Sequence, residues 1–205
     1  MNALSNAVIA SRIIARSADI SALALQIGSE EYQQPIPSQR DQLWRNEVFA
    51  GGLRFETDGC YVCCYSYMTQ LAGYVHTPPQ VASELRYAGC FTGALFARPD
   101  LAQNAFPAVR YDGSRRWHDG PANMDVIFAE LEKGPTIAEV DFQWQTQTLN
   151  QHFVVLLRPT NDRSDIWIAD PWDGSTVRLL LKYAGESWNL SRCIYGLRLF
   201  RAVED

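Results

Sequence analysis

The residues best suited to chemistry in this 205-residue chain are five cysteines and three histidines. Three of the cysteines, Cys60, Cys63 and Cys64, lie within five positions. Cys60 and Cys63 have two residues between them, and two cysteines with this spacing can form half of a structural zinc site. The other half is missing, because Cys90 and Cys193 stand alone and no histidine has a matching partner. We therefore expect no zinc ribbon, no other metal site and no cofactor.

Cys60 has the position of a cysteine nucleophile. It follows Gly59 at the start of a helix predicted over 61–74. A helix N-terminus carries partial positive charge and unpaired N–H groups, and both favour the reactive thiolate form of a cysteine. Gly59 allows a sharp turn and a close approach of a substrate. Cys63 and Cys64 lie one turn further along, where small buried core residues are the simpler interpretation.

A base for this nucleophile is found at the ends of a predicted hairpin. His152 opens one strand and Asp170 closes the next, with a turn-rich stretch between them. If the hairpin is centred on Asn161, His152 faces Asp170. Two apolar pairs follow, Val154 with Ile168 and Leu156 with Ile166. Strand alternation puts all three pairs on one face, so Asp170 would orient the imidazole as the third member of a triad.

Each of these residues also has an ordinary structural interpretation. A histidine at a strand start is often a satisfied surface or core residue, and Asp170 before Pro171 is a common turn former. The other histidines are weaker candidates for a base. His76 precedes Thr-Pro-Pro and is typical of a helix entry, and we expect His118 to be solvated in a loop.

An acyl-transfer site also needs hydrogen-bond donors for an oxyanion. The backbone N–H of Cys60 is one natural donor, and the side-chain amide of Gln39 is our candidate for the second. The alternative for Gln39 is an exposed residue in a polar loop.

The elements that would position these residues follow the order of an α+β protein, with helices first and strands second. Besides 61–74, the periodicity predicts helices over 78–88 and 123–133, and the Gly- and Pro-rich stretch 89–120 is predicted to be a long surface loop. Short apolar and aromatic segments predict strands over 136–142, 152–158, 165–170, 176–181 and 194–200.

Composition and the N-terminal stretch narrow the function classes. The formal charge of −5 without a basic run argues against nucleic-acid binding. Residues 1–27 predict an amphipathic helix that packs on the body or binds a partner protein through 1–28, followed by a linker over 28–39. Two arginines interrupt its apolar run, so we expect no signal peptide and synthesis in the cytoplasm. No stretch reaches the ~20 apolar residues of a membrane span.

The motifs together resemble those of papain-like cysteine peptidases, within them the bacteriocin-processing type that cleaves double-glycine leaders. The likeness covers about residues 36–182 in consistent order. It rests on Ser38-Gln39-Arg40-Asp41, Gly59-Cys60, Thr77-Pro78, His152-Phe153-Val154-Val155 and Asp170-Pro171-Trp172.

This resemblance implies a papain-like α+β fold in which the nucleophile's helix packs on a C-terminal antiparallel sheet. Residues 1–35 would form an N-terminal helical appendage and linker, and 36–205 the peptidase-like domain. Cys60 would be the nucleophile, His152 the base and acid, Asp170 the orienting group and Gln39 the oxyanion donor. The group usually continues from the cysteine with Gly-Pro, whereas this chain has Tyr61, which we expect to narrow the cleft beside the nucleophile.

We therefore expect a thiol-dependent hydrolase that cleaves peptide or peptidoglycan amide bonds through an acyl-enzyme. Acyl transfer to an amine would use the same residues. The Gly-Cys-Tyr-Val form and the attached N-terminal helix also look like versions in phage and prophage proteins. The alternative is thus a catalytically silent component of a phage tail or capsid, associated with the virion, whose N-terminal helix docks on neighbouring subunits.

Overall fold

The computed structural model describes residues 34–93, 95–142, 149–184 and 189–203. Apart from Gln34, these residues belong to one compact unit that spans Pro35–Asp205. The helix predicted over 1–27 and the first part of the predicted linker lie outside the described residues. Within the described part of the chain, no helix combines the length and apolar character that crossing a membrane requires.

The first part of the unit is helical. A short 3-10 turn, η2 (Ala50–Gly52), and α2 (Phe55–Asp58) precede α3 (Cys60–Leu71) and α4 (Pro78–Tyr87). Both longer helices were predicted, and α3 begins at Cys60 itself. Thr77 and Gln80 form a capping box at the start of α4.

Gly59 is the single residue that connects α2 to α3. Its backbone is not in the left-handed region, so the requirement for glycine is steric. A Cβ atom at this position would lie 2.6 Å from the Phe55 carbonyl oxygen and 2.7 Å from Phe55 Cδ1. Phe55 is itself buried in a cluster with Val62 and Cys63. The close approach of Gly59 to Phe55 thus fixes where Cys60 enters its helix.

The second part is an antiparallel sheet. Within the described residues six strands pair in the order β1-β6-β2-β3-β4-β5. Their bounds are β1 (Val109–Arg116), β2 (Thr136–Asp141), β3 (Gln151–Pro159), β4 (Ile166–Asp170), β5 (Ser175–Arg178) and β6 (Ile194–Ala202). The remaining elements are the 3-10 helix η3 (Pro99–Asn104), α5 (Met124–Leu131), α6 (Leu179–Tyr183) and α7 (Leu190–Cys193). The α+β class is confirmed.

Two predicted elements were wrong. Part of the expected loop 89–120 is the edge strand β1, whose charged residues and irregularity between Tyr111 and Ser114 hide the alternation. The end of the expected strand 176–181 is helical, because α6 begins at Leu179. The carboxylate of Asp165 accepts a hydrogen bond from the Leu180 N–H at 3.1 Å, which holds this helix against the start of β4.

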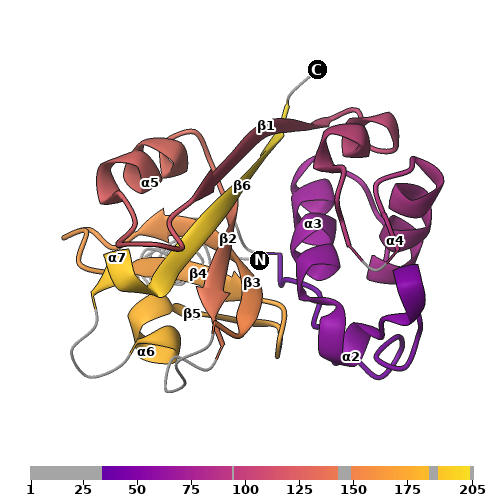
Figure 1. Cartoon of the computed structure of the whole chain (residues 1–205), viewed down its shortest axis with the longest axis horizontal. Helices are drawn as coiled ribbons and strands as arrows, with labels where there is room; N and C mark the ends of the chain where they lie inside the picture. The colour runs from indigo at the N-terminus through magenta and orange to yellow at the C-terminus, as the bar shows by residue number, and fades with distance from the viewer. Residues whose placement is uncertain (1–33, 94, 143–148, 185–188, 204–205) are drawn as a thin grey trace, which may run out of the picture. The chain divides into compact units, whose positions relative to one another are not determined.

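The sheet carries helices on both faces (Figure 1). On one face α3 packs through aromatic rings, with Tyr65 against Phe200 at 4.8 Å between ring centroids. The other face is an aliphatic core built on Val154, Leu156 and Ile168, and α5, α6 and α7 contribute residues to it. β3 lies in the interior of the sheet, so its first residues are held by packing on both sides.

We predict that Gly59→Ala lowers the free energy of unfolding by about 1–3 kcal/mol, because the added methyl group overlaps the backbone of Phe55. Chemical denaturation measures this change. Gly120→Ala is the matched control, since a Cβ there meets nothing within 4 Å, and its effect should stay within about 0.5 kcal/mol. Equal effects of the two substitutions would contradict the steric account of Gly59.

Candidate active site

The hairpin of β3 and β4 brings His152 and Asp170 together, but in a different register from the predicted one. Leu156 pairs with Ile168 rather than with Ile166, and the ladder is irregular between Leu156 and Arg158. The pairing therefore shifts by two residues. Because strand side chains alternate with period two, an even shift leaves the same residues on the same face. Asp170 consequently reaches His152 diagonally instead of from directly opposite.

His152 and Asp170 form a buried hydrogen-bonded pair. His152 Nε2 donates to Asp170 Oδ1 at 2.9 Å, and the residues are 4% and 0% exposed. Burial alone would lower the pKa of His152, but the hydrogen bonds with Asp170 and then with Cys60 outweigh it and raise that pKa to about 9. Burial would likewise raise the pKa of Asp170, yet its bond from His152 and further donors hold this pKa well below the usual range. The pair is built to carry a charged imidazolium against a carboxylate.

Cys60 completes the group from the other side of the unit. It lies at the first position of α3, its side chain is partly exposed, and its interaction with His152 helps to raise the pKa of that histidine. Since Nε2 of His152 is committed to Asp170, Nδ1 is the ring nitrogen left for the sulfur. No side chain caps the N-terminus of α3, so no capping side chain accepts a hydrogen bond from its first N–H groups.

The other cysteines are enclosed. Cys63, Cys64 and Cys90 are 0% exposed and Cys193 is 1% exposed. Burial raises the pKa of the Cys63 and Cys64 thiols well above its ordinary value, with repulsion from Cys60 adding to it. Among the cysteines, Cys60 is the one that is open to reagents.

Gln39 joins the helical part to the sheet part. Its backbone N–H donates to the Pro171 carbonyl at 2.7 Å, directly after Asp170. Its side-chain Nε2 donates to the Glu56 carbonyl at 2.9 Å, four residues before Cys60. The residue is 1% exposed, so the alternative of an exposed loop residue was wrong. A side-chain amide nitrogen carries two hydrogens, and one of them remains beyond the bond to Glu56.

Aromatic side chains surround the pair. The ring of Phe142 lies 5.3 Å from that of His152 and 4.7 Å from that of Trp172, measured between centroids. Trp172 also donates its backbone N–H to Asp170 Oδ1 at 2.9 Å. Trp172 is held in turn by Arg40, whose guanidinium lies 4.7 Å from the ring centroid.

Tyr61 does not narrow the cleft as its position in the sequence suggested. Its ring stacks on Phe153 at 4.5 Å and lies 4.8 Å from Phe96, and its hydroxyl is buried. Tyr61 therefore belongs to the packing between α3 and the sheet. The side chain next to the nucleophile points into the protein and leaves Cys60 accessible.

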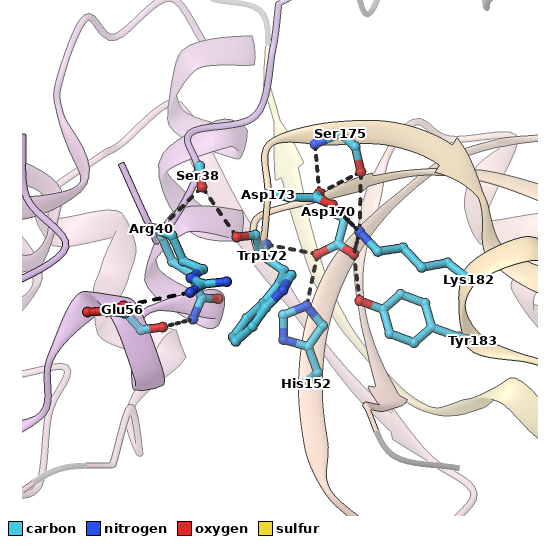
Figure 2. A network of polar contacts seen from close by, with 11 residues as sticks. Ser38, Arg40, Glu56, His152, Asp170, Trp172, Asp173, Ser175, Lys182 and Tyr183 are labelled. Carbon is cyan, nitrogen blue, oxygen red and sulfur yellow. Dashed lines mark hydrogen bonds and ion pairs between the residues drawn. The ribbon is translucent and has the colours of Figure 1, made fainter. Parts of the chain in front are cut away.

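Two residues of the site were missed by the sequence analysis. Lys182 Nζ lies 2.6 Å from Asp170 Oδ2, and the Tyr183 hydroxyl donates to the same oxygen at 2.5 Å (Figure 2). Both come from α6, which was expected to be part strand. No spacing in the sequence indicates them, because their approach depends on how α6 packs under β4.

The remaining histidines lie outside this group. His118 is not simply solvated, because its Nε2 lies 3.1 Å from Oε1 of the buried Glu139. His76 precedes α4, as expected, with its ring 5.7 Å from that of Phe106. Within the described residues no three His, Cys, Asp or Glu side chains are grouped as metal ligands. No family model matches the chain, and no curated protein matches it.

We predict that His152 makes the free energy of unfolding depend on pH. Its pKa is higher in the folded chain, about 9 against 6.5, so the stabilisation is complete below pH 6.5 and is lost as the pH rises through 9. The loss corresponds to something on the order of 3 kcal/mol. It is measured by chemical denaturation at pH 6 and pH 10 in the wild type and in His152→Gln. If the variant shows as large a loss as the wild type, the charged pair is not its source.

Proposed function

We propose that this chain is a thiol-dependent hydrolase of papain-like architecture that cleaves peptide amide bonds, including those of peptidoglycan. One observation carries the proposal. A partly exposed cysteine at a helix start interacts with a histidine whose Nε2 is bound to a buried carboxylate. A nucleophile, a base and a group that orients the base are the components of a triad.

In the proposed reaction the proton of the Cys60 thiol passes to His152. The thiolate attacks the carbonyl carbon of the substrate, and the carbonyl oxygen becomes an oxyanion that accepts hydrogen bonds from the Cys60 N–H and Gln39. The carbon–nitrogen bond then breaks as the imidazolium of His152 gives its proton to the departing amine, leaving a thioester. Water, deprotonated by His152, attacks the thioester, releases the acid and regenerates the thiol.

The alternative of a silent structural component is less well supported. A decayed site has no need to keep the nucleophile open while the other cysteines are enclosed. Nor does it need a buried ionised pair, which costs desolvation free energy. The ring of Tyr61 also stacks on Phe153, so it does not obstruct Cys60 as its position in the sequence suggested.

We predict that iodoacetamide alkylates Cys60 faster than a model thiol near neutral pH, since His152 and the helix start both favour the thiolate. Mass spectrometry of the modified chain over time measures the rate. Cys60→Ala should abolish the fast reaction, and Cys63→Ala should retain it, because Cys63 is enclosed. A Cys60 that reacts no faster than the model thiol would falsify the proposed function.

Gln39 gives a test that separates binding of the oxyanion from activation of the thiol. For a peptide that the wild-type chain hydrolyses, Gln39→Ala should lower kcat by about 10²-fold, the usual effect of losing one oxyanion donor. Alkylation by iodoacetamide forms no oxyanion, so its rate should be retained. Gln70→Ala, a partly exposed glutamine near the far end of α3, is the matched control. A parallel loss of both reactions in Gln39→Ala would assign Gln39 a structural role only.

A further inference from the structure

The Asp170 carboxylate is held from both sides. On Oδ1 it accepts hydrogen bonds from His152 Nε2 and from the Trp172 N–H, each at 2.9 Å. On Oδ2 the Tyr183 hydroxyl donates at 2.5 Å and Lys182 Nζ lies at 2.6 Å. Two contacts on each oxygen use the acceptor positions that a carboxylate offers. His152 is therefore one of four groups that bind the Asp170 carboxylate.

Lys182 is fixed in place by a second carboxylate. Its ammonium group donates to Asp173 Oδ1 at 3.0 Å and to Oδ2 at 2.9 Å, and it lies 3.3 Å from Ser175 Oγ (Figure 2). Its side chain is 23% exposed, whereas that of Asp173 is 50% exposed. The stem of Lys182 thus reaches inward from α6 and places a positive charge behind the carboxylate that orients His152.

The positive charge of Lys182 affects His152 through Asp170. A cation within 3 Å of Asp170 offsets part of the attraction that the carboxylate exerts on the imidazolium. Without that offset, the buried carboxylate would hold the proton of His152 more tightly. A histidine that must take a proton from the thiol and give it to a leaving amine works best when its proton affinity is moderate.

We propose that Lys182 is a positioning residue that sets the proton affinity of His152 through Asp170. It keeps Asp170 ionised and weakens the pull of Asp170 on the imidazolium. The catalytic meaning of this inference rests on the proposed function, whereas the change in proton affinity is a property of the folded chain alone.

Several other groups of the described residues lie around His152. The residue opposite it on β2 is the apolar Val140. Among the described residues, the polar and charged groups that interact with the imidazole or its carboxylate partner are Cys60 from α3, Asp170 from β4, and Lys182 and Tyr183 from α6, while Asp173 from the turn after β4 pairs with Lys182. Phe142 and Trp172 add uncharged ring edges. Among these groups Lys182 is the cation.

The test is an NMR titration of the imidazole signals in histidine-labelled protein, in which His152→Gln identifies the signal of His152. Lys182→Met should raise the pKa of His152 by about one pH unit, the effect expected of removing a nearby positive charge. Lys182→Arg should leave the pKa close to the wild-type value. Arg178→Met is the matched control, because it removes an exposed cation next to α6 that pairs with Asp165 and not with Asp170.

An unchanged or lowered pKa of His152 in folded Lys182→Met would overturn the inference. If that variant does not fold, Lys182→Gln keeps a hydrogen-bond donor without the charge and should show the same upward shift. In a chain that hydrolyses peptides, the alkaline limb of the pH–rate profile should move upward with the pKa, which a purely structural role of Lys182 would not produce. The titration needs no turnover, so a chain without hydrolase activity but with the shift would defeat the proposed function alone.

Discussion

The buried carboxylate of Asp170 is the constraint on which the rest of the site depends. A charge without access to water costs several kcal/mol unless donors and counter-charges compensate it. Here four groups do so, and they come from β3, from the turn after β4 and from α6. Each must be correctly placed for the charge to be tolerated, so the carboxylate links the position of the histidine to the packing of the whole sheet end.

The same end of the sheet is where the helical part must meet it. Gln39 bonds to Pro171 with its backbone and to Glu56 with its side chain, and so connects the turn after Asp170 with the helix that precedes Cys60. Cys60 and His152 lie far apart in the chain. Their meeting depends on this connection, on the packing of α3 against the sheet and on the close contact of Gly59 with Phe55. A local error in any of these would separate the sulfur from the imidazole.

Two errors of prediction concern the pairing of strands. The register of the β3–β4 hairpin was off by two residues because the turn is centred further along the chain than Asn161, as the pairing of Pro159 with Ile166 shows. The face was nevertheless right, since alternation is a local property. The edge strand β1 was missed because its charged residues are stabilised by pairing with β6 rather than by burial. One error thus concerns how two consecutive strands pair and the other concerns pairing with a strand far along the chain, and the local pattern indicates neither.

The sequence alone determined the α+β class, the helices that begin at Cys60 and Pro78, the burial of Cys63 and Cys64, and the pairing of His152 with Asp170. These follow from helical periodicity, turn composition and strand alternation, which are local. Only the tertiary structure decided that Gln39 is buried between two carbonyl groups, that Tyr61 packs inward, and that Lys182 and Tyr183 hold the second oxygen of Asp170. These contacts join segments far apart in the chain, and the desolvation cost of a buried charge selects them only once the elements have packed.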